Sequence, residues 1–139
     1  MTIPITNLHG SRIIEQIQRN LIQLQLDLVS NAKSHKAMAQ VQSPDLATLQ
    51  RFKNDCVAQY LRRLQWVDDL SAHPEKGARL RLSLSKRGWE ENDIMDVVVA
   101  LKVAVMKLKD APHSSYEEIS TACDVVLNSV SQPDSLWPE

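Results

Sequence analysis

The chain of 139 residues contains little glycine and few aromatic residues. It has three glycines, and only 4% of its residues are Phe, Trp or Tyr. Strand-rich domains usually carry aromatic side chains in their strands and glycine in their turns, so this composition favours an all-α fold. Three glycines also leave little material for a loop that cradles phosphates, and the sequence contains no GxGxxG, P-loop or GxSxG motif.

The sequence also lacks a long uninterrupted apolar run. A membrane-spanning helix needs about 20 apolar residues, and Lys102 interrupts the most apolar stretch. No basic region followed by an apolar block marks a secretory signal near residue 1. We therefore expect no membrane insertion and a cytoplasmic protein, or one incorporated into an assembly that is built in the cytoplasm. The two cysteines, Cys56 and Cys123, fall on apolar helix faces and are interpreted as reduced core thiols.

Residues that could carry out chemistry are scattered rather than grouped. The four histidines lie in separate segments: His9, His35, His73 and His113. None of them has a histidine, cysteine or carboxylate partner at the spacing of metal ligands. The acid pairs Glu90-Glu91 and Glu117-Glu118 fall at expected helix starts, where the helix dipole favours negative charge. We therefore expect no catalytic residues, no metal and no cofactor, and interpret the chain as a non-enzyme.

The most apolar stretch, residues 90–109, is expected to be the helix around which the others pack. Its apolar residues recur at helical spacing: Ile94, Val97, Val98, Leu101, Val105 and Leu108. Alternating valines would also suit a strand, but the stretch is about twice as long as a usual strand. Its middle is apolar nearly all round, which predicts a helix that is buried on most faces.

Three further helices are predicted from apolar spacing and helix-start residues. The first runs from residue 11 to about 41, with a heptad-like apolar stripe that weakens after Asn31. The second opens at Ser43-Pro44-Asp45, with Ser43 as its cap, and runs to about residue 71. The last opens at a capping box formed by Ser114 with Glu117 or by Ser115 with Glu118. The short link between the first two helices predicts that they are antiparallel neighbours.

The region between the second and third predicted helices, residues 72–88, is expected to be an irregular basic connection. Residues 79–85 alternate between polar and apolar, which suits a strand or a short helix. We favour a short helix or an extended segment over an internal sheet. Residues 73–88 contain five basic residues and one acid, whereas residues 89–139 contain three basic residues and ten acids. The predicted fold is all-α: a four-helix-bundle-like single domain at 11–131, between an N-terminal arm at 1–10 and a C-terminal tail at 132–139.

The two arms carry apolar residues that need burial. Ile3 and Ile5 lie in the N-terminal arm, and Leu136 and Trp137 lie in the tail. Either the chain's own helices or a neighbouring subunit could cover them. We expect these four residues, together with Arg79 and Arg81, to bind protein partners. The chain is accordingly interpreted as a structural or interaction subunit of adaptor or connector type. It would act as a homo-oligomer or within a hetero-assembly, such as a phage virion or a secretion-type complex.

A nucleic-acid-associated protein is the alternative interpretation. The basic side chains would contact phosphates, and Trp89 would stack on a base. A net charge of −1 and the lack of a recognisable recognition helix make this alternative weaker. The residues concerned are Lys76, Arg79, Arg81, Lys86, Arg87 and Trp89.

Overall fold

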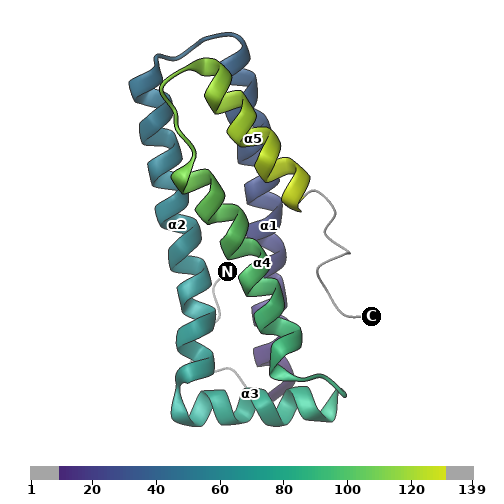
Figure 1. Ribbon diagram of the computed structural model, residues 1–139. Coiled ribbons are helices and arrows are strands. Elements are labelled where there is room, and N and C mark those ends of the chain that lie inside the picture. Colours follow the sequence, from purple (N-terminus) through teal and green to yellow (C-terminus); the bar gives the residue numbers. More distant parts are fainter. Residues whose placement is uncertain (1–9, 131–139) are drawn as a thin grey trace.

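A computed structural model describes residues 10–130 of the chain, and within that range it contains five α-helices and no strand (Figure 1). The helices are α1 (Gly10–Gln40), α2 (Leu46–Ala72), α3 (Pro74–Lys86), α4 (Glu91–Asp110) and α5 (Tyr116–Val130). The all-α prediction is confirmed. Residues 1–9 and 131–139, and with them Ile3, Ile5, Leu136 and Trp137, lie outside the described residues.

The helices run up and down around a common core. The long helices α1 and α2 are antiparallel, α3 lies across one end of the pair, α4 runs back from that end, and α5 returns beside α1 (Figure 1). Helix α5 packs mainly on α1, whereas α4 packs on α2 and α5. Direct contact between α1 and α4 is slight. The fourth and fifth helices therefore close the structure by packing on each other as well as on the long pair.

The predicted apolar faces meet in this core. The heptad-like stripe of α1 is buried along its length: Ile13, Ile17, Leu21, Leu24 and Leu28. Val98 and Leu101 of α4 are also buried, as the apolar spacing of that stretch predicts. Burying side chains of this size supplies about 1.5–3 kcal/mol each relative to leaving them in water. The core of this domain is therefore built from the α1 stripe and the inner face of α4.

The connection between the second and third predicted helices is not irregular, because residues 74–86 form helix α3. Of the two favoured alternatives for residues 79–85, the short helix is therefore confirmed and the extended segment is wrong. His73 caps this helix, since its Nδ1 accepts a hydrogen bond from the backbone N–H of Lys76 at 3.1 Å. Pro74 in the first turn has the φ angle that a helix requires. Leu80 and Leu84, four residues apart, are both buried. Leu80 and Leu84 therefore lie one turn apart on the buried face of a helix. The alternation of polar and apolar residues in this segment does not mark the two faces of a strand.

A glycine allows α3 to fold tightly against the end of α2. A Cβ atom at Gly77 would lie 2.2 Å from the carbonyl oxygen of Ser71, which is a backbone atom that cannot rotate away. Gly77 is itself buried. Only glycine fits at this close approach between the two helices, so Gly77 helps to set the sharp turn that lays α3 across the end of the domain.

The starts of α2 and α5 lie where the sequence predicts them, but the capping residue of α2 differs. Asp45, rather than Ser43, caps α2, and its side chain accepts a hydrogen bond from the backbone N–H of Thr48 at 2.9 Å. At α5 one half of the predicted capping box is found, since the Ser115 hydroxyl accepts a hydrogen bond from the backbone N–H of Glu118 at 3.1 Å. The Glu118 carboxylate accepts hydrogen bonds from the hydroxyls of Ser114 and Ser115 instead of completing the box. These bonds satisfy backbone donors that the first turn of a helix leaves unpaired.

Candidate functional site

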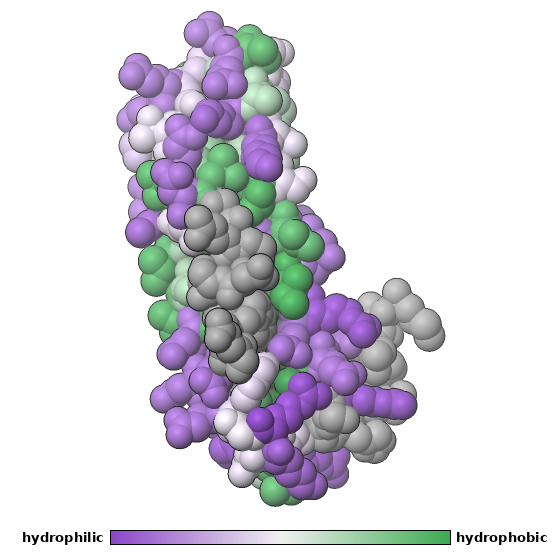
Figure 2. Space-filling view, turned by 90° about the vertical axis from the view of Figure 1, so that its right-hand side faces the viewer, coloured by the Kyte–Doolittle hydropathy of each residue, from purple (hydrophilic) through white to green (hydrophobic). Residues whose placement is uncertain are grey.

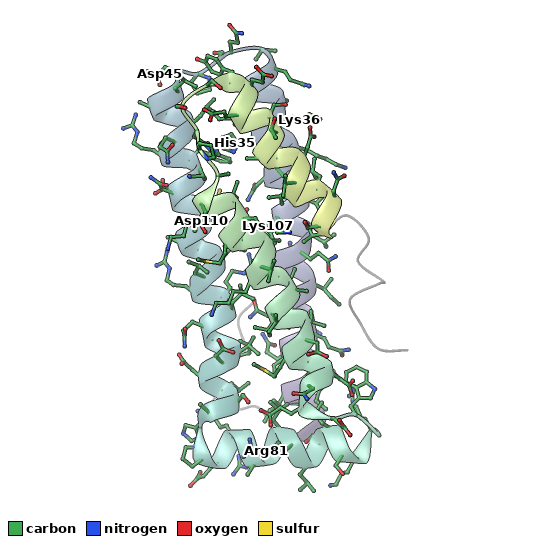
Figure 3. All side chains as sticks on the ribbon, viewed as in Figure 1. His35, Lys36, Asp45, Arg81, Lys107 and Asp110 are labelled. Carbon is green, nitrogen blue, oxygen red and sulfur yellow. The ribbon has the colours of Figure 1, made fainter. Side chains whose placement is uncertain are left out.

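The basic residues at 76–87 lie on and just after α3, at one end of the molecule. Arg81, labelled in Figure 3, is exposed and its Nη1 lies 3.4 Å from a carboxylate oxygen of Glu91. Arg87 lies 3.7 Å from the carboxylate of Glu15 in α1. Two of the five basic side chains therefore have acidic partners within the chain.

Two other basic residues of α3 share one exposed face. Arg79 and Lys86 are exposed and have no acidic partner among residues 10–130. Leu82, which is 59% exposed, lies between them at helical spacing. Lys76 is half-buried at the start of the helix, and Trp89 is half-buried against the core. The structure thus offers a small basic face with an apolar centre, but it does not present Trp89 as an open stacking platform.

A second surface, which sequence reasoning missed, lies between α4 and α5. Val99 and Val103 of α4 are 56% and 47% exposed, and Val125 of α5 is 39% exposed. Together with Met106 they line a shallow apolar groove, and Lys102 and Lys107 lie on its rim. We call this surface the α4–α5 groove. The expectation that α4 is buried on most faces is therefore wrong for this side of the helix.

The exposed valines of α4 have a regular arrangement. Val99, Val103 and Met106 are spaced by four and three residues, which places them in one stripe along the helix. Figure 2 shows hydrophobic residues at mid-height of the molecule on the side where α5 packs, with hydrophilic residues towards both ends. On α1, Ile22 and Leu26 are also exposed. Exposed apolar residues therefore include this stripe and parts of α1, in addition to Leu82 on α3 and Val41 after α1.

A third group of residues is polar but buried, at the end opposite α3. His35 of α1 and His113 of the link between α4 and α5 are both buried, and their ring centroids are 5.3 Å apart. The ring of Phe52 approaches His35 edge-on at 5.0 Å. Two of the four histidines, which lie far apart in the sequence, are therefore neighbours in the structure (His35 is labelled in Figure 3).

Lys53 of α2 is buried beside these histidines and clamps the end of α4. Its Nζ donates hydrogen bonds to the carbonyl oxygens of Lys109 and Ala111 at 3.1 and 3.2 Å. The last carbonyls of a helix have no partner within the helix and carry its negative dipole end. Burial lowers the pKa of Lys53. The ammonium group thus serves a structural purpose where α4 ends.

The buried histidines are held in the neutral form. Burial, helped by the nearby His113 and Lys53, lowers the pKa of His35 to about 4. The pKa of His113 is also lowered, first by burial and then by Lys53. Nδ1 of His113 lies 3.0 Å from the carbonyl oxygen of Pro112. Nε2 of each ring has no hydrogen-bond partner within the described chain.

The void beside this buried cluster is small. The void that His35 lines with Cys56 and Tyr60 measures about 10 Å³, which is roughly the room that one water molecule takes. Burial raises the pKa of Cys56, and it raises that of Cys123 to about 11, so neither thiol is ionised near neutral pH. Over residues 10–130, no three histidine, cysteine or acidic side chains come together in a way that could hold a metal ion.

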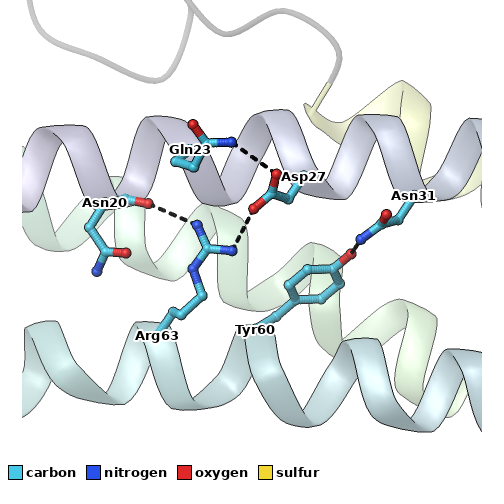
Figure 4. A network of polar contacts seen from close by, with 6 residues as sticks. All are labelled: Asn20, Gln23, Asp27, Asn31, Tyr60 and Arg63. Carbon is cyan, nitrogen blue, oxygen red and sulfur yellow. Dashed lines mark hydrogen bonds and ion pairs between the residues drawn. The ribbon is translucent and has the colours of Figure 1, made fainter. Parts of the chain in front are cut away.

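Polar contacts also fix α1 against α2 (Figure 4). Arg63 of α2 lies 2.7 Å from the carboxylate of Asp27, and its guanidinium also approaches the carbonyl oxygen of Asn20 at 3.4 Å. The side-chain amide of Asn31 donates a hydrogen bond to the hydroxyl of Tyr60. Asn31 was expected to weaken the apolar stripe of α1, but here it sets the register of the two long helices.

Comparison with known proteins gives no relative from which a function could be transferred. No protein-family model, no curated protein and no solved structure matches this chain. Within residues 10–130, no helix combines the length and the apolar character that crossing a bilayer requires.

Proposed function

We propose that this protein is a non-enzymatic interaction subunit, of adaptor or connector type, that works within a larger protein assembly such as a phage virion or a secretion-type complex. The observation that supports this most is the α4–α5 groove. Contiguous apolar surface that stays exposed on a folded domain often marks a protein interaction site. The groove also has the stripe of spaced apolar residues into which side chains of a partner segment can pack.

The other parts of the chain have the roles that the sequence predicts. The four-helix-bundle-like domain at 11–131 would be the body of the subunit, and the arms with Ile3, Ile5, Leu136 and Trp137 would be binding segments. Arg79 and Arg81 remain proposed partner contacts on α3. Of these two, Arg79 is the more available, because Arg81 already faces Glu91.

The size of the complex in extracts of the source cells tests this function. We expect the chain to elute from a sizing column far above its own mass of 15.7 kDa. Val103→Asp places a charge in the groove and should shift the chain towards that mass. Val41→Asp is the matched control, because Val41 is 72% exposed and lies outside the groove. Elution of the unaltered chain as a monomer would refute the proposal. If Val103→Asp elutes at the same mass as the unaltered chain, the groove is not the surface that binds the partner.

Nucleic-acid association is the second candidate, and the exposed face of α3 with Arg79 and Lys86 is the observation that favours it. Phosphate contacts by such side chains would make binding weaken steeply as salt rises. Retention of the purified chain on immobilised DNA over a salt gradient measures this directly. Arg79→Glu with Lys86→Glu should then abolish retention, whereas Lys102→Glu on α4 should not. A chain that passes through the column at low salt rules this candidate out.

A further inference from the structure

We propose that the α4–α5 groove binds residues 131–139 of a second copy of this chain, so that two copies exchange their C-terminal segments. This inference rests on the proposed function, because it names the partner of the same groove. It also makes a separate claim, namely that the purified chain associates with itself without any other protein.

The groove has a defined chemical character that its occupant must match. Its floor is apolar, with Val99 and Val103 on one side and Val125 on the other. Lys102, Lys107 and Asp110 also line it, so its charged side chains are two bases and one acid. A fitting occupant would be a short segment with apolar side chains for the floor and acidic ones for the two lysines.

Residues 131–139, SQPDSLWPE, have this composition. Leu136 and Trp137 supply apolar surface, Asp134 and Glu139 are acidic, and the segment contains no basic residue. Tryptophan is enriched among the residues that contribute most to interfaces. The two prolines of the segment reduce the conformational entropy that it loses when it is ordered by binding.

The segment is also long enough for the groove. Nine residues in an extended conformation span at most about 30 Å. The stripe of α4 from Val99 to Asp110 is roughly 16 Å long, at about 1.5 Å per helical residue. The segment is therefore long enough to leave its own helix and still cover the apolar part of the groove.

The start of the segment points to the groove of another copy rather than to its own. Gln25 of α1 donates a hydrogen bond from Nε2 to the carbonyl oxygen of Val130 at 2.8 Å, so the end of α5 is fixed on α1. Asp124 is also held towards α1, since it lies 2.6 Å from Nζ of Lys36. The groove includes Lys107 and Ala111, close to the link at which α5 begins, whereas the segment leaves α5 at its other end, after Val130. The segment would have to reverse its direction to fill the groove of its own chain, whereas a reciprocal exchange between two copies closes a symmetric dimer.

Sedimentation of purified full-length chains over a wide concentration range tests the exchange. The groove variant is Val103→Asp, the segment variant is Trp137→Asp, and Val41→Asp is the control outside both. We expect the unaltered chain and the control to reach twice the mass of the 15.7 kDa monomer, and each of the two variants to stay monomeric. A mixture of the groove and segment variants should regain dimers, because one copy still has an intact groove and the other an intact segment.

The other outcomes overturn the exchange in distinguishable ways. If Trp137→Asp dimerises like the unaltered chain while Val103→Asp does not, the groove binds a different part of the second copy. If the mixed variants stay monomeric, or the unaltered chain is monomeric at every concentration, the segment does not bind in this way. A chain that is monomeric when purified but elutes within a large complex from cell extracts would refute the exchange and leave the proposed function standing. Circular dichroism and melting of each variant check that the domain is folded in all of these measurements.

Discussion

His35 and His113 face each other inside the domain with their ring centroids 5.3 Å apart, although one belongs to α1 and the other to the link that precedes α5. Both are neutral, because burial opposes a positive charge on either ring. Lys53 lies beside them and already carries the positive charge that binds the end of α4. Protonation of either histidine would place a second positive charge in the same buried region.

The first prediction is that the domain loses stability as pH falls. The pKa of His35 is lowered from 6.5 to about 4, so below pH 6.5 the unfolded chain binds a proton that the folded chain does not. The stability linked to His35 is therefore fully present above pH 6.5, declines as pH falls, and levels off below about pH 4. The slope for one such histidine is at most about 1.4 kcal/mol per pH unit. Urea unfolding at several pH values measures this slope.

His35→Leu is the variant that tests this cause, since leucine fills a similar apolar position without a titrating group. We expect the loss of stability between about pH 6.5 and 4 to become smaller, and the loss that remains to include the contribution of His113, whose pKa is also lowered by burial. A slope that stays the same in His35→Leu would show that other groups cause the acid sensitivity.

The second prediction concerns the clamp at the end of α4. Lys53→Met keeps most of the apolar stem but leaves the carbonyl oxygens of Lys109 and Ala111 without their donor. Leaving buried acceptors unpaired should cost about 1–3 kcal/mol of unfolding free energy. Lys107→Met is the control, because Lys107 is exposed on the same end of α4 and should change stability by about 0.5 kcal/mol or less. Equal effects of the two substitutions in chemical denaturation would contradict the assignment of Lys53 as a clamp.

The third prediction tests the core. Leu101 is completely buried in α4, and Leu101→Ala should lower the free energy of unfolding by about 2–5 kcal/mol because it leaves a cavity. Val41→Ala, at a side chain that is 72% exposed and lies outside the α4–α5 groove, should have little effect. A loss below about 1 kcal/mol for Leu101→Ala would place the core elsewhere.

The parts of the fold that follow from local patterns could be predicted from the sequence. The spacing of apolar residues located α1, α2, α4 and α5, and it identified Val98 and Leu101 as buried. The capping serine of α5 was also recognisable, because a cap depends on neighbours three residues away. Such features involve only residues that are close along the chain.

The remaining features depend on contacts between distant segments. The apolar stripe of α1 weakens at Asn31 and His35. The sequence of that helix does not show that Asn31 binds Tyr60 of α2 or that His35 packs beside His113. The α4–α5 groove was missed for the same reason, since Val99 and Val103 are as apolar as the valines that are buried. Helix α3 was obscured because Leu82 is exposed between two buried leucines, which gives a helix the alternation of a strand.

The last prediction concerns the glycine that sets the position of α3. Alanine is normally favoured over glycine inside a helix by about 1 kcal/mol, so Gly77→Ala would stabilise α3 if space were available. A Cβ at this position would instead lie 2.2 Å from the carbonyl oxygen of Ser71, and the end of α2 or the whole of α3 would have to move. We therefore expect Gly77→Ala to destabilise the domain by about 1–3 kcal/mol, as overpacking does.

Gly88→Ala is the control that separates this steric effect from backbone strain. Gly88 has a φ of +75° but no atom within 4 Å of a Cβ built on it, so its replacement by alanine should cost only the roughly 1–2 kcal/mol of a left-handed conformation. The two substitutions differ most clearly in structure: Gly77→Ala should shift the amide resonances of α3 and of the end of α2, whereas Gly88→Ala should shift only those of the neighbouring loop. A Gly77→Ala domain that is as stable as the unaltered one, with unshifted resonances in α2, would show that α3 does not approach α2 this closely.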